Sequence, residues 1–183
     1  MQSVGINLKL LEIFTLLFSD IKKNHGITQL NLNNVQAEVK DLQLHILLAD
    51  DDPDDIEIFQ EALMEVAPHI KISSVNDGET LMLFLKKQKP NLLFLDLNMP
   101  CKNGLECLDE IRAVKSYNYL PVIIYSTTVN AAQVDASYLK GASLYLQKPS
   151  HFDGIKKSIA RILSNSIAVL LEQPVKSKFV FKL

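Results

Sequence analysis

The feature that most constrains the fold is a repeat that starts at Leu44. Short apolar runs alternate with amphipathic stretches, with a period of about 25 residues in this chain, as in successive βαβ units. The runs are nearly continuous in apolar character, which is typical of strands covered on both faces of a parallel sheet. We therefore predict five parallel strands, at residues 45–49, 70–75, 92–95, 122–125 and 144–146.

The amphipathic stretches between these runs are predicted helices. Asp52 followed by Pro53 is a typical helix start, with a capping carboxylate and a proline in the first turn. Pro90, Gly104 and Pro121 fall where connections between elements are expected. The helices are predicted over residues 53–66, 78–87, 105–114, 131–140 and 152–171, which gives a doubly wound α/β domain with (βα)5 topology over residues 44–171.

Two segments flank this domain. Residues 1–43 break the repeat and predict an N-terminal helical extension over 6–23, followed by a polar linker. Residues 172–183 form a C-terminal tail that is too short for an effector domain. The apolar stretch over 4–18 contains Lys9 and Glu12, is shorter than a bilayer-spanning helix and lacks a signal-peptide pattern. We predict no membrane span and no export.

The charge and the cysteine content indicate which partners and which cellular compartment to expect. The 183 residues are 48% hydrophobic with a net charge of −2, which suits one compact core. Such a balance carries no basic footprint for nucleic acid or for an anionic membrane surface. The two cysteines, Cys101 and Cys107, are too few for a disulfide framework or a zinc site. A cytoplasmic protein with no nucleic-acid partner is expected.

Carboxylates follow two of the predicted strands. Asp50, Asp51 and Asp52 come directly after the first strand, and Asp96 comes after the third. Ligands of open parallel sheets bind beyond the carboxyl ends of strands, near the point where strand order reverses, so Asp50, Asp51 and Asp96 are expected in one pocket. Carboxylates at close range repel one another unless a cation shares the site. Mg²⁺, which prefers oxygen ligands and phosphate, is the expected ion.

Two further residues suggest phosphoryl chemistry. Ser126 follows the fourth strand and Lys148 the fifth, so a hydroxyl and an ammonium would face the same crevice. These groups could hydrogen-bond and neutralise a phosphoryl group carried by Asp96. Each feature also has an ordinary explanation, because an acidic run can simply cap a helix, and a single lysine or serine after a strand is commonly a solvated or turn residue. The coincidence at four strand ends favours a site.

These residues carry a resemblance to the receiver domain of bacterial two-component response regulators, of the stand-alone type. The matching segments occur in order and at family spacing over about the last three quarters of the chain. They are ILLADDDP at 46–53, NDGE at 76–79, LDLNMP at 95–100 with GLE at 104–106, PVIIYS at 121–126 and GASLYLQKP at 141–149. The resemblance implies a flavodoxin-like fold.

The resemblance also implies residue roles. The implied roles are phosphoacceptor for Asp96, Mg²⁺ ligands for Asp50, Asp51, Asp96 and the backbone carbonyl of Asn98, switch hydroxyl for Ser126, phosphate-binding lysine for Lys148 and aromatic switch for Tyr145. Tyr145 is equally well explained as a half-buried strand aromatic. The family also implies a cis bond before Pro149. Thr127 departs from the small residue usual there, and its bulk beside the site is expected to affect phosphoryl access and lifetime.

The function implied by the resemblance is that of a phosphorylatable signalling switch, a phosphoacceptor with at most slow self-dephosphorylation and not an enzyme. The expected partners are a histidine kinase or phosphotransfer protein, an unidentified output protein and a second copy of the chain. The second copy would bind through residues 131–140, 144–146 and 152–171.

Three alternative functions compete with this one. A degenerate receiver serving as a docking scaffold is disfavoured because every expected site residue is present. An aspartyl-phosphate hydrolase of the haloacid dehalogenase type needs an Asp where this chain has Asn98. A transcription factor would need an output domain after residue 171.

Overall fold

The computed structural model describes residues 44–164 and 167–181. The predicted helix over 6–23 and the linker after it lie outside the described residues. Within the described part of the chain, no helix is both long enough and apolar enough to cross a membrane.

In the residues that the structure describes, six parallel strands form one sheet, in the order β2-β1-β3-β4-β5-β6. All five predicted strands are present, and the C-terminal tail adds a short sixth strand beside β5. The strands are β1 (His45–Ala49), β2 (Lys71–Val75), β3 (Leu92–Leu95), β4 (Val122–Ser126), β5 (Leu144–Gln147) and β6 (Val180–Phe181).

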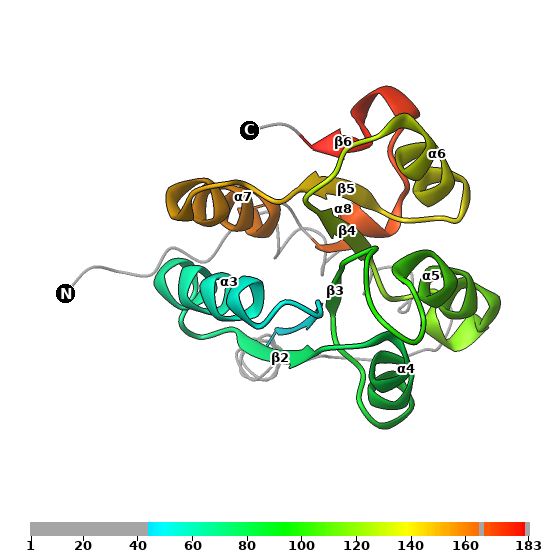
Figure 1. Ribbon diagram of the computed structural model, residues 1–183, viewed down its shortest axis with the longest axis horizontal. Coiled ribbons are helices and arrows are strands. Elements are labelled where there is room, and N and C mark those ends of the chain that lie inside the picture. The colour runs from blue at the N-terminus through cyan, green and yellow to red at the C-terminus, as the bar shows by residue number, and fades with distance from the viewer. Residues whose placement is uncertain (1–43, 165–166, 182–183) are drawn as a thin grey trace, which may run out of the picture. The chain divides into compact units, whose positions relative to one another are not determined.

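Helices cover both faces of the sheet (Figure 1). In the figure α3 and α7 lie side by side on one face, and α4, α5 and α6 lie on the other. The helices are α3 (Pro53–Val66), α4 (Gly78–Lys87), α5 (Gly104–Ala113), α6 (Ala131–Leu139), α7 (Phe152–Ser164) and α8 (Ile167–Leu171), with 3-10 turns at Lys115–Tyr117 and Lys176–Lys178. This arrangement is the predicted doubly wound α/β fold.

Local chemistry fixes where four of these helices begin. The Asp52 carboxylate accepts a hydrogen bond from the backbone N–H of Asp54 at 2.9 Å and caps α3, as the sequence predicted. Asp77 caps α4 and Asn130 caps α6 in the same way. Asn103 starts α5 with a reciprocal capping box. Each cap satisfies backbone donors that the first turn leaves unpaired.

The core consists of two apolar layers, one on each face of the sheet. Successive strand residues point to opposite faces, so Leu47 and Ile124 belong to the layer beneath α4, α5 and α6. Ile46 and Ile123 belong to the layer beneath α3 and α7. The strands β1, β3 and β4 are buried along their whole length, which explains why their sequences are apolar without alternation, whereas β2 is largely exposed or half-buried.

The helix predicted over 152–171 is described in two parts, α7 (Phe152–Ser164) and α8 (Ile167–Leu171), and residues 165–166 between them lie outside the described residues. The structure differs from the sequence prediction in one local feature. The expected cis bond before Pro149 is wrong: the described residues contain no cis peptide bond, and trans is the isomer that X–Pro bonds ordinarily favour.

Candidate functional site

The register of β1 and β3 brings two carboxylates together. Ala49 pairs with Leu95 at the ends of these neighbouring strands, so Asp50 and Asp96 leave the sheet side by side. The backbone N–H of Asp96 donates to the carbonyl of Ala49 at 2.8 Å, which extends the ladder by one residue. In the sheet β1 lies between β2 and β3, so the strand order reverses at β1 and β3. The two carboxylates therefore lie at the carboxyl ends of the strands where this reversal occurs, which is where ligands of such sheets bind.

The neighbouring strands contribute the hydroxyl and the ammonium. Ser126 pairs with Gln147 at the ends of β4 and β5, and the backbone N–H of Lys148 donates to the carbonyl of Ser126 at 2.8 Å. The structure therefore places Ser126 and Lys148 at the same edge of the sheet as Asp96. The side chain of Lys148 is 7% exposed and turns toward the carboxylates.

Lys148 is the centre of an ion-pair network. Its Nζ lies 2.7 Å from Oδ2 of Asp50, 2.7 Å from Oδ2 of Asp55 and 3.9 Å from Oδ2 of Asp96. Burial acts to lower the pKa of Lys148, but the hydrogen bonds and charges of these carboxylates together raise it above its ordinary value. The lysine is therefore charged at neutral pH and partly offsets the buried negative charge.

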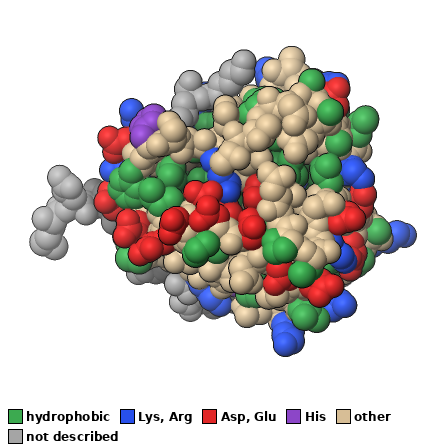
Figure 2. Space-filling model, in the orientation of Figure 1, with side chains coloured by type: hydrophobic (Ala, Val, Ile, Leu, Met, Phe, Trp, Pro, Cys, Tyr) green, Lys and Arg blue, Asp and Glu red, His purple; other side chains and the backbone are tan. Residues whose placement is uncertain are grey.

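The two buried carboxylates are costly to ionise. Burial raises the pKa of Asp50 from 3.8 to about 6, against the opposing effect of Lys148. Burial also raises the pKa of Asp96, opposed by the charge of Lys148 and by hydrogen bonds from the backbone of Leu97 and Asn98. Acidic side chains also gather on the adjoining surface over α3 (Figure 2). The site thus carries more negative charge than its single buried ammonium neutralises.

This arrangement fits a divalent cation. Asp50, Asp51 and Asp96 each offer an oxygen, and these oxygens lie within 4.8 Å of one another. Oδ2 of Asp50 is buried, and within the described part of the chain it is held by its ion pair with the Lys148 ammonium at 2.7 Å and by no backbone hydrogen bond. Asp51 is exposed and completes an open, oxygen-rich cluster of the kind that Mg²⁺ binds. Asp52 does not belong to the cluster, because its carboxylate caps α3.

The remaining predicted residues surround this cluster. Ser126 is fully buried, and its Oγ accepts a long hydrogen bond from the backbone N–H of Thr128 at 3.4 Å. Tyr145 is also fully buried, more deeply than the half-buried strand aromatic considered from sequence, and its hydroxyl donates to the carbonyl of Thr128 at 2.6 Å. Asn98 and Thr127 are exposed at the rim.

Sequence reasoning missed two contributors. Asp55 holds the Lys148 ammonium through its Oδ2, and the carbonyl of Thr128 anchors the Tyr145 hydroxyl. Asp55 was detectable in principle, because it lies one helical turn after Asp52 on the helix whose first turn faces the site. The role of Thr128 depends on a backbone carbonyl, for which the residue type gives no signal.

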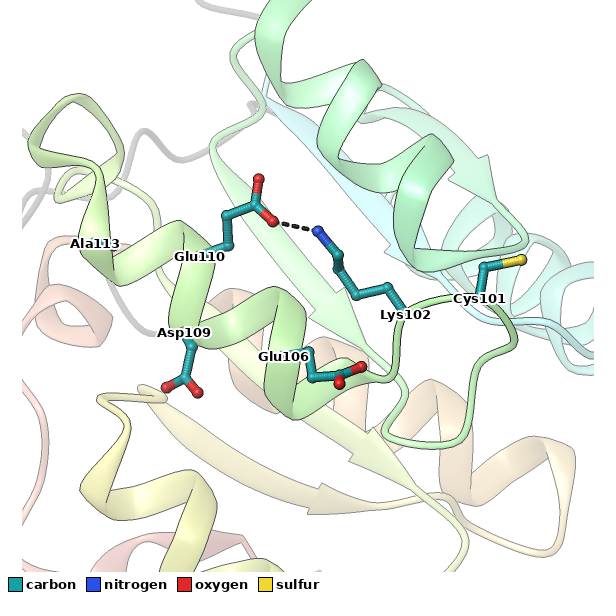
Figure 3. A pocket seen from close by; sticks show the side chains of 6 residues that line it. All are labelled: Cys101, Lys102, Glu106, Asp109, Glu110 and Ala113. Atoms are coloured by element: carbon teal, nitrogen blue, oxygen red, sulfur yellow. Dashed lines mark hydrogen bonds and ion pairs between the residues drawn. The ribbon is translucent and has the colours of Figure 1, made fainter.

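A shallow hollow lies along α5 and the loop before it, and none of Asp50, Asp51 and Asp96 lines it (Figure 3). Lys102 forms an ion pair with Glu110 across it, and the figure shows Cys101 and Asp109 pointing away from that pair. Asp109 pairs instead with Lys140. These charges are paired and partly solvated, so the hollow lacks the buried, unbalanced charge of the Asp96 cluster.

Comparisons with known proteins agree on one family. The model of the response regulator receiver domain matches residues 46–160, which include Asp50, Asp96 and Lys148. The chain is 33% identical over 126 residues to the response regulator Rcp1 of Synechocystis sp., covering 65% of this chain and 86% of that protein. It is 27% identical over 120 residues to a chemotaxis protein CheY homolog of Campylobacter jejuni, covering 66% and 92%.

Solved structures give the same picture. The phosphorylated cyanobacterial phytochrome response regulator RcpA has a TM-score of 0.62 and 29% identity, with 66% of this chain and 91% of that chain covered. The Mn²⁺-bound form of Rcp1 has a TM-score of 0.60 and 33% identity, with 66% and 92% covered. The likeness therefore spans about two thirds of this chain and nearly the whole of each neighbour.

Proposed function

Because the chain belongs to the response regulator receiver domain family of two-component signalling, we propose that it is a phosphorylatable switch whose phosphoacceptor is Asp96. One observation carries the proposal. The buried carboxylate of Asp96 lies at a strand end with Asp50 and Asp51 beside it and with the buried Lys148 ammonium 3.9 Å from its Oδ2. A nucleophilic oxygen, a cation site and a fixed positive charge are what phosphoryl transfer to a carboxylate requires.

In the proposed reaction, an oxygen of Asp96 attacks the phosphorus of a phosphohistidine or of a small acyl phosphate. The new O–P bond forms as the P–N or P–O bond to the donor breaks, and the donor leaves with that electron pair. Oδ1 of Asp96 is held by the backbone N–H of Leu97 at 2.8 Å, so Oδ2, which faces Lys148, is the free oxygen for attack. The chain contributes position and fixed charge, since such transfers need little else from the protein.

Mg²⁺ would be held by Asp50, Asp51, Asp96 and the backbone carbonyl of Asn98, where it would neutralise charge on the phosphoryl oxygens. Lys148 then supplies the second positive charge. Its present ion pairs with Asp50 and Asp55 hold the ammonium near Asp96 before any phosphoryl group arrives. Such preorganisation avoids a reorganisation cost during transfer.

The proposed output is a change of packing around Ser126 and Tyr145. A phosphoryl group on Asp96 favours a Ser126 hydroxyl that turns toward it and donates a hydrogen bond. The segment 127–130 follows Ser126 and carries the Thr128 carbonyl that Tyr145 binds, so the change is transmitted to α6, β5 and α7. The result is a population shift between two packings, biased by contacts with the phosphoryl group.

The proposed partners are a histidine kinase or phosphotransfer protein as donor and an output protein that reads the α6–β5–α7 surface. Transfer of a phosphoryl group from such a donor would take place in the cytoplasm. In it the chain would serve as a phosphoacceptor and not as an enzyme. A homodimer through the same surface, and an effect of Thr127 on phosphoryl lifetime, stay predictions. The docking-scaffold alternative differs in one respect, because it requires no phosphoryl group on Asp96.

The experiment is intact mass spectrometry of the full chain after incubation with acetyl phosphate and Mg²⁺. The proposal expects a gain of one phosphoryl group in the wild type, none in Asp96→Asn, and a strong reduction when EDTA removes the metal. Glu57→Gln, an exposed change on α3, is the matched control and should behave as the wild type. A full yield in Asp96→Asn, or no yield in any protein, would refute the proposal.

A further inference from the structure

The C-terminal arm, defined here as residues 173–181, is docked on the α6 and β5 side of the domain. The side-chain amide of Gln173 donates to the carbonyl of Tyr138 at 2.6 Å and to that of Ala142 at 2.9 Å. Nζ of Lys176 lies 2.8 Å from Oδ1 of Asp135 on α6. A tail of a few residues thus makes both specific polar contacts and a strand pairing with the domain.

Phe179 is the apolar anchor of the arm. Its side chain is fully buried, with its ring centroid 5.1 Å from that of Tyr138 and 6.3 Å from that of Tyr145, both in edge-to-face geometry. Its carbonyl accepts a hydrogen bond from the backbone N–H of Tyr145 at 2.9 Å. The arm therefore contacts Tyr145 through both its ring and its backbone.

The other end of Tyr145 reaches the candidate site. Its hydroxyl donates to the carbonyl of Thr128, whose own N–H donates to Oγ of Ser126. Ser126 is the last residue of β4, which pairs with β3, and Asp96 directly follows the end of β3 at Leu95. A continuous path of contacts therefore runs from Phe179 through Tyr145 and Thr128 to the hydroxyl next to the phosphoacceptor.

We propose that docking of the C-terminal arm is coupled through Tyr145 to occupancy of the Asp96 site, so that each stabilises the other. The inference rests on the proposed function, since the occupant is a phosphoryl group. A docked Phe179 covers the Tyr145 ring and keeps it buried, with its hydroxyl bound to segment 127–130. A phosphoryl group holds the same segment inward through Ser126, so both favour one arrangement. Coupling of this kind is reciprocal.

The arm also determines what the β5 edge offers to a partner. In the described structure β6 pairs with β5 and occupies its hydrogen-bonding edge, with Tyr145 opposite Val180 and Leu146 opposite Phe181. A partner strand that adds to β5 must first displace the arm. Such a partner would therefore bind the unphosphorylated protein better, and phosphorylation would close this edge.

The test is amide hydrogen exchange on the full chain, with and without beryllofluoride and Mg²⁺ as the phosphoryl analogue. In the wild type, the proposal expects exchange at residues 176–181 to slow by at least about fivefold when the analogue binds. Tyr145→Phe keeps the ring against Phe179 but loses the hydroxyl bond to Thr128, so the arm should stay docked and lose the response. Val175→Ala, an exposed change in the arm, is the control and should respond as the wild type.

Phe179→Ala tests the reverse direction. It should expose the arm in all conditions and weaken beryllofluoride binding by at least about fivefold. If the Asp96 peptide becomes protected while the arm of the wild type does not respond, the coupling is overturned and the proposed function stands. If the Asp96 peptide is unaffected and acetyl phosphate adds no mass, the proposed function fails and the coupling fails with it. A full response in Tyr145→Phe would also overturn the coupling.

Discussion

Replacing Asp50 with asparagine should stabilise the metal-free protein at neutral pH. Asp50 is fully buried and shares the site with Asp96, and burial raises its pKa from 3.8 to about 6 even with Lys148 beside it. The folded chain therefore favours the neutral form of this carboxyl. Asparagine has nearly the same shape and carries no charge, so it retains the packing without the cost of ionisation.

The size of the effect follows from the linkage between protonation and folding. Folding raises the pKa of the Asp50 carboxyl from 3.8 to about 6, so between these pH values the folded chain holds the proton more often than the unfolded chain. The free energy of unfolding therefore falls as the pH rises from 3.8 to about 6. At higher pH, ionised Asp50 destabilises the fold by about 3 kcal/mol. Asp50→Asn should gain about 3 kcal/mol near pH 7.5 and less than about 1 kcal/mol near pH 4.

Urea unfolding followed by circular dichroism in EDTA measures this difference across the pH range. Glu57→Gln serves as the exposed control and should shift stability by less than about 0.5 kcal/mol. Adding Mg²⁺ should stabilise the wild type more than Asp50→Asn, since a ligand stabilises the state that binds it. An Asp50→Asn protein that is no more stable than the wild type near pH 7.5, or a gain independent of pH, would refute the reasoning.

Three other outcomes are expected. Asp51→Asn should weaken Mg²⁺ binding measured by calorimetry. Asp52→Asn should leave Mg²⁺ binding intact, because the Asp52 side chain caps α3 and asparagine caps equally well. The opposite order would mean that Asp52, and not Asp51, belongs to the metal site. Gly104→Ala should destabilise the fold by about 2 kcal/mol or more in urea, because a Cβ there would lie 2.1 Å from the carbonyl oxygen of Asp96; a neutral change would mean that this backbone can shift. A chain that begins at Asp41 should fold and still accept a phosphoryl group by mass spectrometry, since the repeat is complete from Leu44; an inert chain would make residues 1–40 part of the domain.

Much of the fold could be predicted because its signals are local and redundant. Continuous apolar runs such as 92–95 have no stable place except a sheet covered on both faces, and Asp52 with Pro53 starts a helix by its own chemistry. The strand β6 could not be predicted in this way. Its two residues pair with β5 only because Phe179 finds a buried position between Tyr138 and Tyr145, and such a position exists only in the folded domain.

The candidate site also has a part that the sequence predicts and a part that it does not. Asp50, Asp96, Ser126 and Lys148 each follow a predicted strand, so topology alone brings them to one edge of the sheet. The ion pair of Lys148 with Asp55 depends on how far α3 tilts over that edge, and residue spacing does not specify a tilt.

The full burial of Tyr145 could not be predicted from the local sequence either. Period-two spacing puts its side chain on one face of β5, but the arm that covers it comes from more than thirty residues later in the chain, beyond any local pattern.

The most direct test of the central claim is to locate the phosphoryl group. The wild-type chain is treated with acetyl phosphate and Mg²⁺, reduced with borohydride, which converts an aspartyl phosphate to homoserine, and sequenced by tandem mass spectrometry. The account predicts homoserine at position 96, with Asp50, Asp51 and Asp55 unchanged. Homoserine at one of those other positions, or intact aspartate at position 96 in protein that has gained a phosphoryl group, would contradict it.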